Sequence, residues 1–187
     1  TWPDAEGSDL VLVPVGSIEQ HGPHLPLDTD TVIAQAVAEA LAESGPLAGA
    51  WVAPPLAYAA SGEHQGFPGT CSIGTDVLAT VVVVLVRSLH QWARRPVLVN
   101  AHGGNITALN RAVEQLQVEG HDVRWVPCAT EEVDLHAGRT ETSLMLHLAP
   151  QTVRMEHAQN FASTSEQRAQ QYPILGNGKS AKLGWAM

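Results

Sequence analysis

The chain has 187 residues, the length of a single average domain, and 44% of them are hydrophobic while 16% are charged. This composition is typical of a globular protein and excludes a disordered or collagen-like chain. Nineteen acidic residues against ten basic ones give a formal net charge of −9. Because nucleic acids and anionic membranes attract positive fields, we expect neither of them as a partner.

The two cysteines, Cys71 and Cys128, are too few for a disulfide scaffold, so we expect a cytoplasmic protein. The apolar runs are shorter than the ~20 residues that span a bilayer, and residues 1–4 do not resemble the start of a signal peptide. We expect Cys71 to be a small packed residue rather than a nucleophile, and Cys128 to be buried at the end of a strand.

The first half of the chain reads as strand, helix, strand and loop. Residues 10–15 are an apolar run of strand length. Hydrophobic residues then recur at helical spacing over residues 32–41, before a Gly-Pro pair ends the helix. A short strand at residues 51–53 precedes a glycine-rich loop over residues 56–74. So long a loop in a compact domain is often functional.

The second half continues the alternation. Residues 75–92 contain four consecutive valines, but the run is too long for a strand and its apolar residues share one helical face, so we predict a helix. A strand is predicted at residues 96–100, followed by a helix that Asn105 can cap. A fourth strand at residues 123–128 and a helix at residues 140–148 complete the pattern.

Alternating strands and helices predict an α/β fold, here a three-layer α/β/α arrangement around a mostly parallel central sheet. We expect residues 1–187 to form a single domain of this kind. No element is predicted with any clear periodicity after residue 150.

Histidines and carboxylates follow the first, third and fourth predicted strands. The carboxyl ends of parallel strands meet at one edge of a sheet, where ligand sites form, so we expect these side chains to converge. The residues concerned are Glu19, His21, His24 and Asp30 after the first strand, His102 after the third, and His136 and Glu141 after the fourth.

Imidazole and carboxylate together suit divalent zinc, iron or manganese, and the absence of nearby thiols disfavours a structural zinc finger. Glu19 and His21 are two residues apart, so in extended backbone they point to the same side and could each serve one of two adjacent ions. Asp30 could bridge both ions with its two oxygens, and His102 would complete the first. The sequence therefore predicts two divalent metal ions, whose charge the carboxylates, Glu141 among them, offset.

A lone histidine after a strand is more often hydrogen-bonded than metal-bound, so this prediction depends on the convergence of three segments. His90, His121 and His147 fall on predicted helices or turns, and a solvent-facing position is the simpler interpretation. His157 stays open. His24 could orient a metal ligand through a hydrogen bond.

Residues 15–30, with the sequence Val-Gly-Ser-Ile-Glu-Gln-His-Gly-Pro-His-Leu-Pro-Leu-Asp-Thr-Asp, resemble the metal motif of the creatininase (creatinine amidohydrolase) family. Residues 67–70, 100–105 and 136–143 resemble other signature segments of that family, in the same order. The resemblance implies an α/β/α fold, a dinuclear metal site, hydrolysis of amide C–N bonds, and a homo-oligomer.

The resemblance also implies individual roles. Glu19, Asp30 and His102 correspond to the ligands of one metal, and His21 with Asp30 to ligands of the other. His136 corresponds to the catalytic histidine of the family. We expect the ions to activate a water molecule for attack on the amide carbon, and His136 to protonate the leaving nitrogen.

One ligand position departs from creatininase itself. In creatininase the second metal takes a glutamate two residues after the histidine that corresponds to His102, and here that position is Gly104. The departure makes creatinine a less expected substrate. Either Glu141 or water could replace the missing ligand.

The Asn-Ala-His-Gly-Gly-Asn form of residues 100–105 looks most like the creatininase-like peptidases of mycofactocin biosynthesis, which release a C-terminal dipeptide from a precursor peptide. We therefore expect a peptidase acting on a peptide or a small amide. Two alternatives stay open: a hydrolase of a small cyclic amide or formamide, of the creatinine or formamidopyrimidine type, and a metal-binding subunit without turnover, which Gly104 favours.

Residues 58–70 are expected to line the substrate pocket. Glu63 and His64 are the polar side chains best suited to contact a substrate there. A solvated loop tip is an equally good interpretation for this pair.

Overall fold

The computed structural model describes residues 2–6, 8–44, 47–129 and 136–158. Its sheet has four parallel strands in the order β2-β1-β3-β4, which confirms the predicted parallel arrangement. The predicted strands all form, the second and fourth being shorter than expected. Their bounds are Leu10–Val15 for β1, Trp51–Val52 for β2, Arg95–Asn100 for β3 and Arg124–Pro127 for β4.

The helices follow the predicted order along the chain. The valine-rich run is helical, as its length and spacing predicted, and it ends three residues earlier than expected. The α-helices are α1 (Trp2–Ala5), α2 (Thr29–Glu43), α3 (Thr75–Leu89), α4 (Ile106–Val118) and α5 (Arg139–Leu148). Short 3₁₀ turns occur at η2 (Gly62–His64), η3 (Gly103–Asn105), η4 (Pro150–Thr152) and η5 (Met155–His157).

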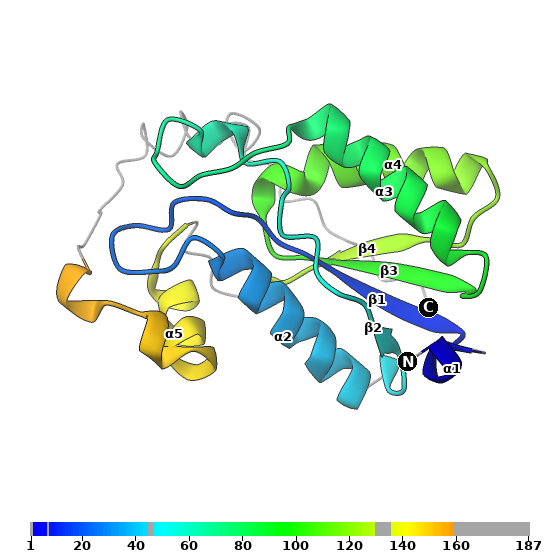
Figure 1. The fold of residues 1–187 in the computed structure, drawn as a ribbon, viewed down its shortest axis with the longest axis horizontal. Helices are drawn as coiled ribbons and strands as arrows, with labels where there is room; N and C mark the ends of the chain where they lie inside the picture. Colours follow the sequence, from blue (N-terminus) through cyan, green and yellow to red (C-terminus); the bar gives the residue numbers. More distant parts are fainter. Residues whose placement is uncertain (1, 7, 45–46, 130–135, 159–187) are drawn as a thin grey trace.

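The helices form two layers around the sheet. Helices α3 and α4 lie on one face, and α2 and α5 lie on the other (Figure 1). Alternate residues of β1 serve the two faces: Val11 and Val13 pack with α3 and α4, and Leu12 packs with α2. Both sides of the strand are therefore apolar, as a buried parallel strand requires, and the three-layer α/β/α prediction is confirmed.

The strand register brings three chain segments to one edge of the sheet. Val15 at the end of β1 pairs with Asn100 at the end of β3, and Asn100 pairs with Pro127 at the end of β4. The loops that follow β1 and β3 therefore leave the sheet side by side, next to the first turn of α2 (Figure 1).

The role predicted for Asn105 is wrong. Its side chain makes no capping hydrogen bond to α4. Instead the fully buried amide accepts a hydrogen bond from the Ala60 N–H at 3.0 Å and donates to Gly16 O at 2.9 Å and Asn100 Oδ1 at 3.1 Å. Asn105 thus ties the ends of β1 and β3 to the loop around Ala60. These buried backbone groups would otherwise lack partners, which outweighs the local gain from a cap.

The cysteine predictions had mixed outcomes. Cys71 is exposed, so the expectation of a packed residue is wrong. Its backbone N–H still holds the loop by donating to Ile18 O at 2.9 Å. Cys128 is half-buried, and burial raises the pKa of its thiol to about 12.

In the part of the chain that the structure describes, none of the helices combines the length and the apolar character that crossing a bilayer requires.

Candidate metal centre

The chain after β1 delivers alternate side chains to one side. Ser17, Glu19 and His21 are all fully buried, and the Glu19 N–H donates to Leu27 O at 2.9 Å to fix the segment. Glu19 and His21 therefore enter the same interior space, as their spacing predicted.

Gly16 allows α2 to approach this segment closely. A Cβ at Gly16 would lie 2.4 Å from the Cα of Thr31, so any side chain there would push the first turn of α2 away. The Thr31 hydroxyl donates to Ser17 O at 3.0 Å. This contact places Asp30, the second residue of α2, in the same interior space.

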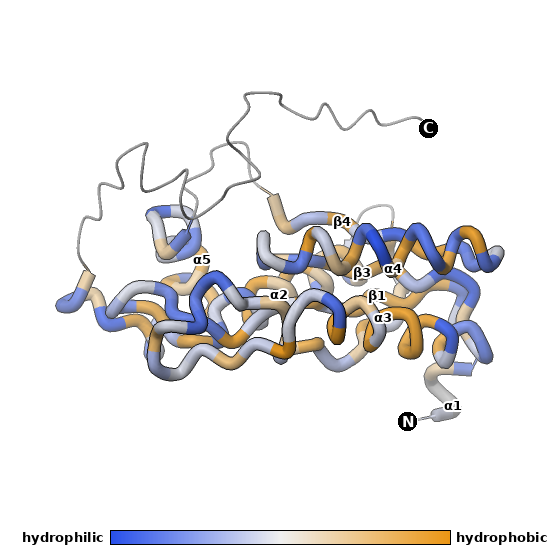
Figure 2. The backbone as a smooth tube through the Cα atoms, turned by 90° about the horizontal axis from the view of Figure 1, so that it is seen from above, coloured by the Kyte–Doolittle hydropathy of each residue, from blue (hydrophilic) through white to orange (hydrophobic). Residues whose placement is uncertain are grey.

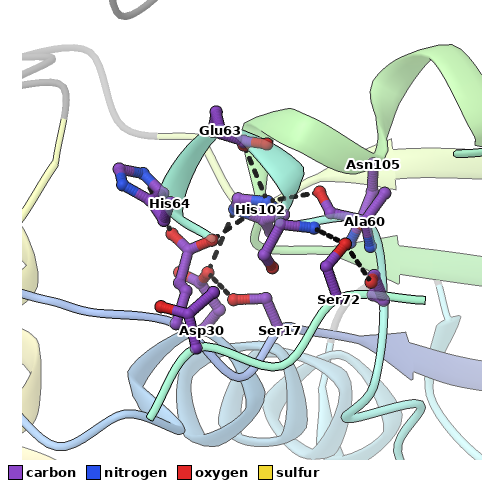
Figure 3. Close-up of polar contacts among 12 residues, drawn as sticks. Ser17, Asp30, Ala60, Glu63, His64, Ser72, His102 and Asn105 are labelled. Carbon is purple, nitrogen blue, oxygen red and sulfur yellow. Dashed lines mark hydrogen bonds and ion pairs between the residues drawn. The ribbon is translucent and has the colours of Figure 1, made fainter. Parts of the chain in front are cut away.

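Asp30 faces two different histidines with its two oxygens, and Figure 3 shows the contact with His102. Its Oδ1 lies 3.2 Å from His21 Nε2, and its Oδ2 lies 3.2 Å from His102 Nδ1 and accepts a 2.7 Å hydrogen bond from Ser17 Oγ. Asp30 is only 2% exposed. A carboxylate that bridges two ions needs this division of its oxygens between two sets of ligands.

Glu19 is a fully buried carboxylate without hydrogen bonds. Neither of its oxygens has a hydrogen bond of ordinary geometry to a described residue, and the Ser61 side chain stabilises its charge only slightly. Three histidines surround it instead: its Oε2 lies 3.2 Å from His102 Nε2, and its Oε1 lies 3.6 Å from His136 Nδ1 and 3.7 Å from His64 Nε2. Burying a carboxylate without hydrogen bonds costs free energy unless a cation binds next to it. The residues present therefore fit a bound divalent metal.

The pKa values of the buried carboxylates and histidines also indicate that the site needs positive charge. Burial raises the pKa of Glu19 to about 7. Burial also opposes the charge on His21 and His102, yet their hydrogen bonds to Asp30 raise the pKa of both, that of His21 to about 9. Burial acts against the Asp30 anion, but hydrogen bonds from these histidines hold its pKa well below the usual value. Without metal, the protons on His21 and His102 therefore supply the positive charge of the site, and bound metal ions would take their place.

His136 lies beside this cluster and stays neutral. Burial, together with the nearby charge of His21, lowers the pKa of His136 to about 3. Its ring lies 4.4 Å from that of His21 and stacks on His64 at 4.5 Å with an interplanar angle of 16°. Its Nε2 lies 2.7 Å from Gln20 O, and its Nδ1 faces Glu19.

Glu141 lies on α5 and approaches the cluster next to His21. It is the third residue of that helix, and one oxygen accepts a hydrogen bond from the N–H of Ala137, a residue with a positive φ of 50°. The other oxygen lies 4.0 Å from His21 Nε2.

Among the described residues, four groups of ligand atoms could each surround an ion, since in each group the atoms lie within 4.8 Å of one another. The structure thus brings together the predicted site residues. Two groups share Asp30: Glu19, Asp30 and His102, and His21, Asp30 and Glu141. The other two share Glu19: Glu19, His21 and His136, and Glu19, Glu63 and His64.

Glu63 occupies the space that a side chain at Gly104 would need. Its Oε1 lies 3.2 Å from His102 Nε2, on the opposite side of the ring from Asp30 (Figure 3). A Cβ on Gly104 would lie 2.3 Å from that oxygen and 2.4 Å from Ala60 O. The loop around Ala60 therefore excludes a side chain at position 104 and brings a carboxylate of its own to the edge of the site.

Glu63 and His64 were predicted to be possible substrate contacts, but the depth at which His64 lies was not predicted. His64 is 2% exposed, so a solvated loop tip is the wrong interpretation for it, whereas Glu63 is partly exposed. Burial lowers the pKa of His64. Gln20, which contacts both His64 and His136, was not singled out at all.

The remaining histidines lie outside the cluster. His24 was given as a side chain that could orient a metal ligand; its Nε2 instead lies 2.8 Å from the Thr142 hydroxyl and so links its loop to α5. The rings of His90 and His121 contact each other at 4.5 Å, and His147 is exposed.

Comparison with known proteins gives the family. The creatininase family, described as creatinine amidohydrolase, matches residues 1–186, so the chain belongs to it. The mycofactocin precursor peptide peptidase of Mycolicibacterium smegmatis is 58% identical over 147 residues, covering 77% of this chain and 60% of the relative. The protein of the same name from Mycobacterium ulcerans is 47% identical, covering 98% and 72%. The chain thus spans about 60% of the length of the first relative.

Creatinine amidohydrolase of Pseudomonas putida is more distant, at 31% identity over 83% of this chain and 72% of the relative. Solved structures of creatininases also match this chain. A creatinine amidohydrolase (creatininase) structure matches with a TM-score of 0.69 and 29% identity, covering 85% of this chain and 74% of that one. A creatininase mutant described as Zn-Zn type has a TM-score of 0.69 and 30% identity, covering 84% of this chain and 73% of that one. A structure described as creatininase Mn has a TM-score of 0.68 and 29% identity, covering 84% and 74%. Divalent metal binding is therefore a property of close structural neighbours.

We predict that metal uptake releases protons. His21, with a pKa of about 9, is protonated at neutral pH without metal, and Glu19, with a pKa of about 7, is partly protonated. Because zinc must displace these protons, its apparent affinity should rise with pH, by about tenfold per pH unit for each proton displaced. Titration calorimetry with ZnCl₂ in two buffers of different protonation enthalpy measures the release. Heats that do not depend on the buffer, with an affinity that does not change between about pH 6 and 8, would contradict this account.

Proposed function

We propose that the protein is a dinuclear-metal peptidase that hydrolyses an amide C–N bond of a mycofactocin precursor peptide and releases a C-terminal dipeptide. The observation that carries the proposal is the pair of ligand groups sharing Asp30, next to a neutral histidine. The names of the relatives from Mycolicibacterium smegmatis and Mycobacterium ulcerans support the peptide substrate.

Each ion would be held by one of the two groups. Glu19, Asp30 and His102 would bind the first ion, and His21, Asp30 and Glu141 the second. Zinc, iron and manganese all accept imidazole and carboxylate ligands, and the zinc and manganese forms of creatininase support this choice. When bound, such ions lower the pKa of water towards neutrality and polarise a carbonyl group.

His136 is suited to carry the proton in this reaction. Its Nε2–H donates to Gln20 O, so in the neutral ring Nδ1 carries no proton and can accept one from the attacking water on the side that faces Glu19. The same nitrogen can then deliver that proton to the departing amide nitrogen. Without this step an amine leaves poorly. The contact of His136 Nε2 with Gln20 O fixes the direction of the ring.

The two alternatives have less support. A metal-binding subunit without turnover was favoured by Gly104, but the group of His21, Asp30 and Glu141 supports a carboxylate ligand for a second ion, and Glu63 fills the space beside His102. A small cyclic amide such as creatinine has the support of the Pseudomonas putida relative at 31% identity, against 58% for a peptidase-named one.

The proposal predicts that the zinc-loaded protein cleaves a synthetic peptide with the C-terminal sequence of the mycofactocin precursor, and that His136→Ala slows this reaction. We expect kcat to fall by about 10²–10⁴-fold while metal content stays unchanged, because His136 transfers a proton rather than binding metal. Mass spectrometry follows the released dipeptide, and elemental analysis follows the metal.

His147→Ala, which changes an exposed histidine of α5, is the matched control and should keep full activity. A loss of metal in His136→Ala would assign His136 to the ligands instead. A wild-type protein that holds both ions and cleaves creatinine but not the peptide would contradict the proposed substrate.

We also propose that the protein forms a homo-oligomer. The outer face of α3 exposes Val77 and Val84, which are 53% and 58% accessible, beside the partly buried Val81 and Leu85. Figure 2 shows how strongly hydrophobic this helix is. An apolar groove runs along the same face, which suits a second copy of the chain.

Sedimentation measurements should therefore give the mass of an oligomer, and Val84→Glu should reduce it by placing a charge in the contact. Val118→Glu, at an 86% exposed position on α4, is the control and should leave the mass unchanged. A monomeric wild-type protein at micromolar concentration would refute this part of the proposal.

A further inference from the structure

His64 has an unusual position for a histidine that the proposed reaction does not use. It is 2% exposed, and its Nε2 has no hydrogen-bond partner among the residues that the structure describes. This nitrogen lies 3.7 Å from Glu19 Oε1, which is equally without a hydrogen bond. A buried, unpartnered nitrogen that points into the candidate site indicates that a group other than the described residues, such as a bound substrate, completes its hydrogen bonding.

Gln20 determines which nitrogen of His64 carries the proton. The Gln20 Oε1 accepts a hydrogen bond from the Gly22 N–H at 3.1 Å, so the NH₂ group of this amide faces the other way. There its Nε2 lies 3.0 Å from His64 Nδ1. It also approaches His136 Nε2 at 2.8 Å, but that nitrogen carries the proton that it donates to Gln20 O at 2.7 Å, so the acceptor for the amide is His64 Nδ1. An amide nitrogen only donates, so His64 Nδ1 accepts. In a neutral imidazole the proton then belongs to Nε2.

This tautomer makes His64 a donor rather than a metal ligand. The ligand atoms of Glu19, Glu63 and His64 lie within 4.8 Å of one another, so an ion between them is geometrically conceivable. A histidine that binds metal through Nε2, however, donates its Nδ1–H to an acceptor. Here Nδ1 meets a donor, so Nε2 presents an N–H to the site.

The ring of His64 is also held firmly. It stacks on His136 and contacts Phe67, with ring centroids 6.4 Å apart. The backbone of the η2 turn is fixed by the His64 N–H donating to Ser61 O at 3.1 Å and by the Phe67 N–H donating to His64 O at 3.0 Å. A donor that is already in place costs no reorganisation when negative charge develops beside it.

We propose that His64, through its Nε2–H, donates a hydrogen bond to the oxygen of the scissile amide and stabilises the negative charge that this oxygen gains when the carbonyl carbon is attacked. The inference rests on the proposed peptidase function and deepens it. His136 and His64 then have separate tasks on adjacent, parallel rings: His136 moves the proton, and His64 holds the oxygen.

Two substitutions test this role. The amide nitrogen of His64→Gln can reach the position of Nε2 and donate there, whereas His64→Asn reaches only the position of Nδ1 and keeps a partner for Gln20. We expect His64→Asn to lower kcat by about 10²–10³-fold, the usual effect of removing one such donor, with KM and metal content nearly unchanged. His64→Gln should recover most of this loss. His147→Asn is the control and should have no effect.

A spectroscopic measurement gives a second readout. In the zinc-loaded, ¹⁵N-labelled protein, a long-range ¹H–¹⁵N correlation spectrum should show His64 protonated at Nε2, with the resonance assigned by its loss in His64→Gln. Three results would overturn the inference while leaving the peptidase intact: His64→Asn with full kcat, loss of one metal equivalent in that variant, or protonation at Nδ1. A fully metal-loaded wild-type protein that cleaves no peptide would instead overturn the proposed function, and the role of His64 with it.

Discussion

The centre of this molecule is organised around a carboxylate that the chain buries without satisfying. Glu19 is inaccessible and has no hydrogen bond of ordinary geometry within the described ranges, although three imidazole rings lie close to it. Such a group is costly to bury unless positive charge meets it. Asp30 shares the same space at the start of α2, where the helix dipole favours an anion. Two adjacent carboxylates with histidines around them form a site that is suited to divalent cations.

The architecture supports this arrangement with ordinary packing. A central strand that is apolar on both faces needs helices on both faces, and the parallel register then gathers the loops at one edge. Gly16 lets α2 approach, and the buried amide of Asn105 ties that edge to the loop around Ala60. The same loop brings Glu63 and His64 to the site. The fold thus places ligands and substrate-facing groups together through contacts distant in sequence.

Much of this could be predicted from the sequence because the signals were local. Strand-length apolar runs gave the parallel sheet, and the length of the valine-rich segment distinguished helix from strand. The convergence of Glu19, Asp30 and His102 followed from topology alone. The buried role of Asn105 could not be predicted, since its preference for helix caps is local while its hydrogen bonds are tertiary. His64 was equally hidden, because a loop without periodicity carries no signal for burial.

The claim on which the account depends is that two cations share Asp30. Anomalous diffraction from crystals of the zinc-loaded protein, recorded on both sides of the zinc absorption edge, tests it without relying on activity. The account predicts two peaks, about 3.5–4 Å apart as in other two-metal sites, one beside Glu19 and His102 and one beside His21 and Glu141. A single peak, or peaks that do not contact Asp30, would contradict it.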